Sequence, residues 1–256
     1  MFFTLYKYSQ KPKCVSIKKL LLIHGPSLAI GAGIASISIV IAFLAITAIN
    51  DEPELVMEPT QNPPEISPSV ISSIFMANAS HILGNPDAPV TLVEFGDYQC
   101  HFCNVHFHNT EHRLLENFIQ TGKVKMIFKD FTIIGPDSVN AAHGAHCAND
   151  QGKFWQYHDV LYTNWTGENN GWASSDNLLR FAQEINLDID EWSECMIDAR
   201  HSQIIADSSN DARDLGITGT PAFFVIGPDS KITKISGAQP YEKFEEIFNA
   251  ELEKDQ

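Results

Sequence analysis

The first 50 residues contain no aspartate or glutamate, although the chain of 256 residues carries 32 acidic side chains. Five of its 17 lysine and arginine residues lie in that stretch, which leaves 12 basic groups against 32 acidic groups in the rest, a formal charge of −20. A surface this negative repels phosphate groups. The composition therefore excludes nucleic acid and anionic membranes as ligands of residues 51–256, and it favours solubility.

Ionisable side chains are also absent from residues 27–49, "SLAIGAGIASISIVIAFLAITAI". A helix of this length crosses roughly 30 Å of hydrocarbon. Lysines precede it and acids follow it, so we predict a cytoplasmic segment 1–26, a transmembrane helix 27–49 and an extracytoplasmic remainder, with the chain held at the cell membrane by a single pass. A cleaved signal peptide, which would release a secreted form, is the alternative; the long apolar run and the lack of a clean A-x-A site argue against it.

Residues 50–79 lack steady hydrophobic periodicity and contain five prolines and scattered acids. This composition is typical of an extended, partly disordered tether. The chain has no internal repeat. From residue 80 onward the pattern becomes that of a globular domain that extends to residue 256.

The pattern of that domain alternates between strands and helices. β-branched and apolar runs predict strands, and apolar residues at helical spacing predict helices. In order we expect a strand at 88–95, a helix at 101–120, a strand at 123–131, a helical block at about 136–211, a hairpin of strands at 221–227 and 231–237, and a helix at 241–254. This order predicts an α/β domain with helices on a central sheet and a helical insertion.

Cysteine is scarce, with five in the chain, yet two of them form the C-x-x-C of "EFGDYQCHFCNV". Cys100 falls where the first strand gives way to a helix, and free backbone N–H groups there favour a thiolate. Cys103 lies one helical turn further on, within reach of a bond to Cys100. A thiolate beside a second thiol is the arrangement that disulfide exchange requires.

Other roles for the pair are weaker. Haem attachment needs a histidine after the second cysteine, where the chain has Asn104. A metal site could draw on His106 and His108, but a helix would send these side chains to different faces, and no second cysteine pair stands at zinc-site spacing. A disulfide across four residues closes too small a loop to stabilise much by chain entropy. We therefore expect no metal, and redox chemistry is the favoured interpretation.

Two motifs in this order, "VTLVEFGDYQCHFC" and "GITGTPAFFVIG", with a helical block between them, resemble the DsbA-like branch of the thioredoxin superfamily. The resemblance covers about residues 80–256. It implies a thioredoxin-like fold with an inserted helical domain, thiol–disulfide oxidoreductase activity outside the cytoplasm, and no cofactor beyond the cysteine pair. It also implies that Cys100 is the attacking thiol, Cys103 the more buried resolving thiol, and Pro221 a cis proline facing them.

Further residues gain expected roles. His101, when protonated, would stabilise the Cys100 thiolate, although the best-known oxidases carry a histidine at the second middle position rather than the first. Glu94 interrupts an apolar strand where the family has a buried acid that exchanges a proton with the resolving thiol. The resemblance implies that the backbone at Thr220, just before Pro221, pairs with an extended substrate.

Cys147 and Cys195 lie in the helical block without an obvious motif. A structural disulfide, worth about 3–4 kcal/mol in the entropic model, is the simplest interpretation, and two free buried thiols are the alternative.

We expect a dithiol oxidase that introduces disulfides into reduced, unfolded exported proteins and is reoxidised by a membrane-embedded enzyme similar to DsbB or VKOR. The alternatives are a disulfide isomerase or reductase, and a metal-binding module that uses Cys100, Cys103 and nearby histidines.

Overall fold

The computed structural model describes residues 73–80 and 82–255. The predicted cytoplasmic segment 1–26, the predicted transmembrane helix 27–49 and most of the predicted tether lie outside these residues. Within the described part of the chain, no helix is both long enough and apolar enough to cross a membrane.

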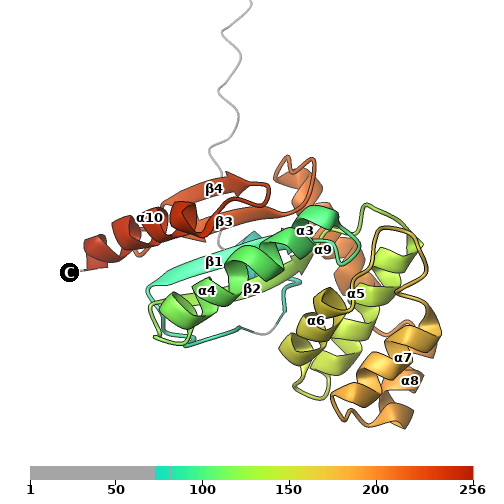
Figure 1. Cartoon of the computed structure of the whole chain (residues 1–256). Coiled ribbons are helices and arrows are strands. Elements are labelled where there is room, and N and C mark those ends of the chain that lie inside the picture. The colour runs from blue at the N-terminus through green and yellow to red at the C-terminus, as the bar shows by residue number, and fades with distance from the viewer. Residues whose placement is uncertain (1–72, 81, 256) are drawn as a thin grey trace, which may run out of the picture. The chain divides into compact units, whose positions relative to one another are not determined.

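A sheet of four strands in the order β2-β1-β3-β4 forms the centre of the domain (Figure 1). β1 (Val90–Gly96) pairs in parallel with β2 (Val124–Asp130) and antiparallel with β3 (Ala222–Ile226), which pairs antiparallel with β4 (Ile232–Ser236). All seven residues of β1 are buried, because it is an inner strand covered on both faces. The parallel pair requires a crossover connection, which the following helix supplies.

That crossover is one helical segment of mixed geometry. It comprises α3 (His101–His106), the π-helical turn η1 (Phe107–Glu111), α4 (His112–Leu114) and a second π-helical turn η2 (Leu115–Ile119). A π-helical turn holds an extra residue and so changes which side chains face the sheet; such turns are frequent at functional sites. The helix predicted over 101–120 is therefore present, but it is not a regular α-helix.

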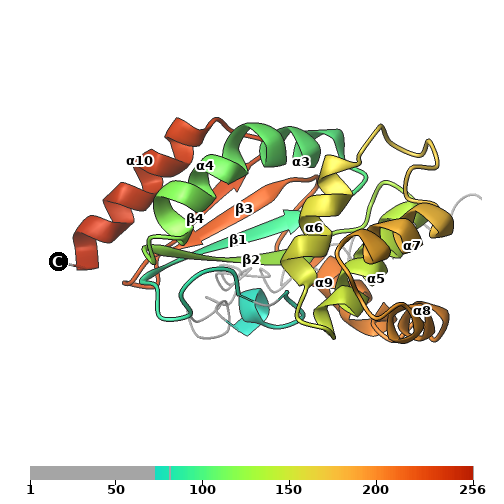
Figure 2. The ribbon, with the colours of Figure 1, turned by 60° about the horizontal axis from the view of Figure 1, so that its bottom comes forward.

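The sheet has a helical layer on one face formed by this segment and α10 (Tyr241–Leu252), as Figure 2 shows. Leu92 of β1 and Val225 of β3 pack there against Leu114, Phe118, Phe244 and Phe248. The opposite face carries Val93, Phe95 and Phe224, which pack with Phe75 and with Ala212 of α9 (Ser202–Asp214). Alternate residues of each strand thus serve two separate apolar clusters.

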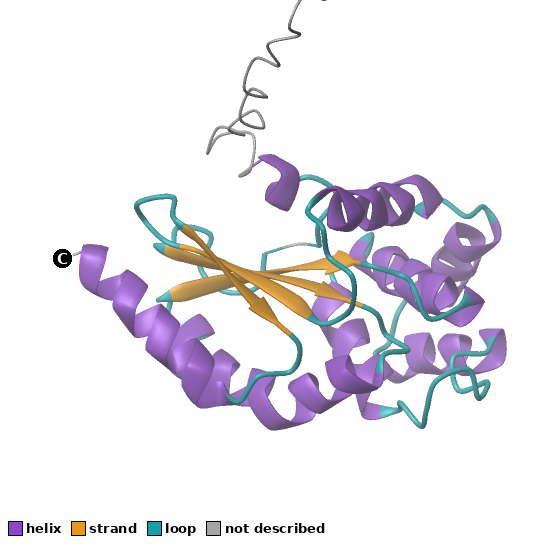
Figure 3. Ribbon diagram, turned by 90° about the horizontal axis from the view of Figure 1, so that it is seen from above, coloured by secondary structure: helices purple, strands orange, loops and turns teal. Residues whose placement is uncertain are grey.

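The helical insertion lies to one side of the sheet, apart from α10 (Figure 3). Its helices are α5 (Pro136–Asn149), α6 (Phe154–Thr163), α7 (Ser175–Glu184), α8 (Ile189–Ile197) and α9. Tyr157, Leu161 and Phe181 are buried in a third cluster that also contains Cys100 and Cys103. The insertion therefore shares its core with the predicted redox pair.

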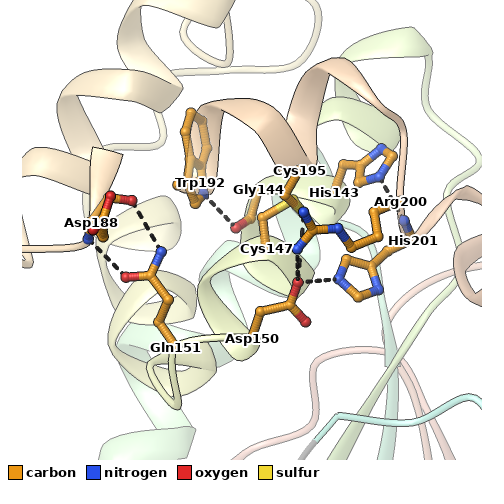
Figure 4. Close-up of a disulfide and its surroundings, with 10 residues drawn as sticks. All are labelled: His143, Gly144, Cys147, Asp150, Gln151, Asp188, Trp192, Cys195, Arg200 and His201. Carbon is orange, nitrogen blue, oxygen red and sulfur yellow. Dashed lines mark hydrogen bonds and ion pairs between the residues drawn. A yellow bond between two sulfur atoms is a disulfide. The ribbon is translucent and has the colours of Figure 1, made fainter. Parts of the chain in front are cut away.

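A disulfide between Cys147 of α5 and Cys195 of α8 joins two helices of the insertion, with an S–S distance of 1.97 Å (Figure 4). Beside it the Trp192 indole N–H donates to the carbonyl of Gly144 at 3.0 Å. Asp150 accepts from Arg200 and contacts the His201 ring, each at 2.9 Å. The structural disulfide predicted between Cys147 and Cys195 is therefore present.

The folded domain begins earlier than the predicted boundary at residue 80. Residues 73–76 form a helical turn, and Phe75 in it is 1% exposed. Its ring lies 4.7 Å from that of Phe224. Lys129, on β2, is fully buried and donates to the carbonyls of Ile74 and Ala77 and to the Asp211 carboxylate. The last residues assigned to the tether are part of the domain, because an aromatic ring and a buried ammonium hold them to the sheet.

Candidate active site

Cys100 and Cys103 lie at the start of α3, at the end of β1. Cys100 is the residue before the helix, with extended backbone angles, and its N–H donates to the carbonyl of Asp97 at 2.9 Å. Both cysteines are free thiols, Cys100 5% exposed and Cys103 1% exposed. The more accessible sulfur is therefore the first, in the order that the predicted roles require.

The two thiols have opposite pKa shifts. The pKa of Cys100 is lowered from 9.0 to about 6, chiefly by a hydrogen bond from Cys103, with help from Thr220 and from the backbone N–H groups of Cys103 and Phe102 that outweighs burial. The pKa of Cys103 is raised well above 9.0 by burial first, then by its bond to Cys100. At neutral pH the reduced pair therefore holds one thiolate and one thiol, the state suited to exchange.

The loop before β3 faces Cys100. The Thr220–Pro221 peptide bond is cis, and the Cys100 sulfur lies 3.3 Å from the Thr220 carbonyl oxygen, to which it donates when it is protonated, across 120 residues of sequence. A cavity of about 230 Å³ lies along this loop, lined by residues 217–222, Lys234, Ser236 and Gly237. The structure thus brings the second sequence motif against the first.

His101 and Phe102, between the cysteines, point outward. The His101 ring lies 5.6 Å from that of Trp165 and 5.3 Å from that of Phe102, whose side chain is 59% exposed. The His101 backbone N–H donates to Glu168 at 3.0 Å. The largest contributions to the lowered pKa of Cys100 come from other groups. The predicted role of the His101 imidazole stays a prediction.

Glu94 lies behind the pair on β1 and is 1% exposed. Burial raises its pKa well above 4.5, and the charges of Glu111 and Cys100 raise it further. In turn, the charge of Glu94 contributes to the raised pKa of Cys103. Glu94 is therefore buried and interacts electrostatically with Cys103, and its role as the proton donor to the resolving thiol stays a prediction.

Two side chains that the sequence did not single out hold the loop between β1 and α3. The buried Asp97 carboxylate accepts from the backbone N–H groups of Gln99, Ile133 and Ile134 at 2.8, 2.8 and 3.0 Å. Gln99, fully buried, accepts from the Trp172 indole at 3.2 Å. A polar loop between two apolar elements carries no periodic signal, which is why these residues were missed.

Polar side chains also gather in the core below the pair. His106 is 1% exposed, His158 is fully buried and Glu111 is 7% exposed. The sequence does indicate that Glu111 is buried, because it stands at helical spacing from the apolar Phe107, Leu114 and Phe118. His158 likewise replaces an apolar residue between Phe154 and Leu161. Both residues lie on the apolar faces of their helices, and each places a titratable side chain in the core.

The residues of the alternative metal site are not brought together. His106 is buried whereas His108 is exposed. Among residues 73–80 and 82–255, three groups place carboxylate, imidazole or sulfur atoms within 4.8 Å of one another, and none includes Cys100 or Cys103. One group contains Cys147 and Cys195, whose sulfurs are already bonded to each other.

Comparisons with known proteins agree with this geometry. The family model for thioredoxin matches residues 77–250. The probable disulfide bond formation protein D of Bacillus cereus is 31% identical over 160 residues, which cover 61% of this chain and 74% of that protein. The oxidised crystal structure of BdbD from Bacillus subtilis superposes with a TM-score of 0.60 at 26% identity, covering 67% of this chain and 92% of that one.

A different kind of relative matches over a shorter part of its own length. The Na(+)/H(+) antiporter NhaA 1 of Salinispora arenicola is 32% identical over 149 residues, 57% of this chain. The chain spans 22% of that antiporter. The likeness therefore concerns one part of the antiporter only.

Proposed function

Because the chain belongs to the thioredoxin family, and its likeness to the disulfide bond formation proteins makes it a protein-disulfide oxidoreductase, we propose that it is a dithiol oxidase. Its Cys100–Cys103 disulfide would accept electrons from the thiols of reduced, unfolded proteins outside the cytoplasm. The observation that carries this proposal is the geometry of the pair: Cys100 lies at the start of α3 against the Thr220–Pro221 loop, and Cys103 is buried one turn further on. The opposite pKa shifts of the two thiols agree with it.

The exchange runs in two steps. A client thiolate attacks the Cys100 sulfur, a client–Cys100 disulfide forms, and Cys103 leaves as a thiolate that takes up a proton. A second client thiolate then attacks the client sulfur of that bond, and Cys100 leaves as a thiolate. The client is oxidised to a disulfide and the pair is reduced by two electrons. A Cys100 pKa of about 6 makes this sulfur a good leaving group, which favours the oxidation of clients.

The surroundings of Cys100 support extended, unfolded clients. Phe102 is exposed beside the sulfur, and the cavity along Thr220 and Pro221 borders the start of β3. An extended segment that pairs with backbone there would present its cysteine to Cys100. Such pairing requires few side-chain contacts, so it would accept many sequences.

The proposed oxidase is held at the cell membrane. The pattern of residues 1–50 favours an N-terminal anchor with the thioredoxin-like domain outside, and a membrane enzyme similar to DsbB or VKOR would restore the Cys100–Cys103 disulfide. Cysteine labelling from either side of the membrane tests the orientation. Protection of the domain from an external, membrane-impermeant reagent would contradict it.

Refolding of reduced ribonuclease A tests the oxidase proposal. The oxidised protein should restore ribonuclease activity, and the Cys100→Ser/Cys103→Ser variant should not. Equal rates for the two would remove the pair from the mechanism.

Equilibration of the pair with glutathione separates the alternatives. We expect a potential clearly above that of thioredoxin, about −270 mV, as an oxidase requires, whereas a potential near that value would indicate a reductase.

A further inference from the structure

Beneath the redox pair lies a continuous group of titratable side chains from three elements. Glu94 comes from β1, His106 and Glu111 from the helical segment that starts at Cys100, and His158 and Asp159 from α6. The π-helical turn η1 ends at Glu111 and buries it. None of the last four residues belongs to either sequence motif of the family.

The five side chains form two overlapping sets. Ligand atoms of Glu94, His106 and Glu111 all lie within 4.8 Å of one another, and so do those of Glu111, His158 and Asp159. Glu111 belongs to both, and its Oε1 is 3.4 Å from Nε2 of His158. The first four residues are buried, whereas Asp159 is exposed. The group therefore runs from the core beneath the cysteines to solvent.

Several buried polar atoms in this group lack a hydrogen-bond partner. Among the described residues, Oε2 of Glu94, Oε2 of Glu111 and both ring nitrogens of His106 have no hydrogen-bond partner. The His158 ring is oriented by its Nδ1, which lies 3.2 Å from the Tyr98 hydroxyl, so its Nε2 faces Glu111. Buried polar atoms without partners are costly, and their retention calls for a functional explanation.

The proposed oxidase reaction supplies one. When a client attacks Cys100, Cys103 leaves as a thiolate and takes up one proton. When the pair is reoxidised, the Cys100 thiolate attacks a disulfide of the reoxidant, a Cys100–reoxidant disulfide forms, and the other reoxidant sulfur leaves. The Cys103 thiol then loses that proton, its sulfur attacks Cys100, and the reoxidant sulfur bonded to Cys100 leaves. One proton thus enters and one leaves per cycle at a sulfur that is 1% exposed. If Glu94 alone held the proton, it would stay a buried carboxylate for as long as the pair is reduced, and burial raises its pKa and so disfavours that state. Exchange with solvent through the neighbouring groups would keep Glu94 neutral.

We propose that Glu94, Glu111, His106 and His158 form a proton path that connects Cys103 to solvent at Asp159, an inference that rests on the proposed function. Glu94 exchanges the proton with Cys103. Glu111 and the imidazoles pass it to His158, and Asp159 exchanges it with water. These residues are positioned for proton transfer only; the sulfur chemistry stays with Cys100 and Cys103.

The electrostatics set which of these groups hold a proton at neutral pH, and burial lowers the pKa of His106 to about 4, so its imidazole is neutral there. Burial raises the pKa of Glu111, but the charges of His158, His106 and His112 outweigh it and lower the pKa overall, whereas the pKa of Glu94 is raised. Glu94 therefore holds its proton more tightly than Glu111, so Glu111 is protonated only briefly as a proton passes between Glu94 and His158. The titratable groups that face these carboxyls from the packed elements are Cys100, Cys103, Tyr98, Tyr162, His106, His112, His158 and Asp159.

The test isolates the loss of the proton from Cys103. Reduced full-length protein is mixed with excess oxidised glutathione, which forms a Cys100–glutathione disulfide, and the release of glutathione by Cys103 is followed from pH 5 to 9. In Glu111→Gln we expect this step to slow about tenfold or more at neutral pH. We also expect its rate to rise with pH, because hydroxide must then replace the path.

Two further variants sharpen the result. Glu116→Gln changes an exposed carboxyl of the same helical segment and should match the parent at every pH. Asp159→Asn changes the exposed end of the path, where folding is not at risk, and should slow the step by a smaller factor that added buffer restores. If Glu111→Gln does not fold, Asp159→Asn decides the matter alone.

The failure of this inference is distinct from the failure of the proposed function. A parent protein that does not exchange thiols with glutathione contradicts the oxidase. A parent that exchanges normally, with Glu111→Gln and Asp159→Asn following its pH profile, overturns only the proton path. Stoichiometric zinc in protein purified without chelator, lost in Glu111→Gln, also overturns the path, because the metal would occupy the same atoms.

Discussion

At the scale of single residues, Cys100 and Cys103 stand one helical turn apart and yet hold their protons very differently. The reason is the direction of the hydrogen bond between them. Cys103 donates to the Cys100 thiolate, which favours the charged form of Cys100 and the neutral form of Cys103. Each sulfur therefore depends on its neighbour for its state. The same interaction that prepares Cys100 for attack keeps Cys103 protonated until it is needed.

Replacement of Cys103 by alanine removes the largest cause of the low pKa of Cys100. We expect that pKa to move from about 6 toward 9.0 in Cys103→Ala, as measured by thiolate absorbance at 240 nm. In the reduced parent the lowered pKa adds stability that is complete above 9.0 and is lost as pH falls through about 6. Chemical unfolding of the reduced protein should therefore show this slope, and Cys103→Ala should lose most of it. An unchanged thiolate titration would contradict the assignment.

The pKa of Glu94 is shifted in the opposite direction from that of Cys100, so its contribution to stability changes with pH in the opposite sense. Its raised pKa means that burial penalises the carboxylate, so the stability that its neutral form provides is complete below 4.5 and declines as pH rises. We expect Glu94→Gln, which keeps the neutral form at every pH, to be more stable than the parent at pH 7 and to match it near pH 4. Urea unfolding of the oxidised forms measures both. A variant less stable than the parent at pH 7 would show that the carboxylate is stabilised by its surroundings.

At the scale of elements, the strand β2 is joined to the first residues of the domain and to α9 through one side chain. Lys129 is fully buried, and its ammonium is 2.7 Å from the Asp211 carboxylate and 2.7 Å from the carbonyl of Ile74. Burial lowers the pKa of Lys129, and the bond and charge of Asp211 act against that shift. A buried charge of this kind depends on its partner.

Loss of that partner should be costly. We expect Asp211→Asn to reduce the free energy of unfolding by about 3 kcal/mol, since it leaves an uncompensated buried ammonium. Asp214→Asn, an exposed change on the same helix, should have little effect. Urea unfolding at pH 7 compares the three proteins. Equal midpoints for Asp211→Asn and Asp214→Asn would show that the ion pair contributes nothing.

At the scale of the whole molecule, the domain starts within the segment that its composition assigns to a tether. Phe75 packs against Phe95 and Phe224 on the face of the sheet opposite α10. The thioredoxin family match begins at residue 77 and so does not include it. Through Phe75, a short segment before the family match packs against the sheet.

Two truncations test that boundary. A chain that starts at residue 73 should unfold at a higher urea concentration than one that starts at residue 80. The difference should be about 3 kcal/mol, the cost of removing a buried phenylalanine. Both should retain thiol exchange, because the cysteine pair and the Thr220–Pro221 loop remain. Equal stability of the two chains would place the boundary back at residue 80.

The sequence by itself determined the order of the elements, the C-x-x-C pair at the end of the first strand, and the pairing of Cys147 with Cys195 as the simplest use of two cysteines. These features depend on neighbours along the chain or on counting, so local patterns suffice to predict them. It placed Glu111 and His158 at positions where helical spacing calls for apolar residues, but it did not show that the two side chains meet. Nor did it place the start of the domain, because Phe75 stands in a proline-rich stretch.

Only the tertiary structure decided which groups act on the cysteines. Thr220 is 120 residues from Cys100 in the chain and 3.3 Å from it in space. His158 reaches Glu111 from α6, at 3.4 Å. Proton affinities depend on burial and on charges within a few ångströms, and those distances exist only after folding has brought distant segments together.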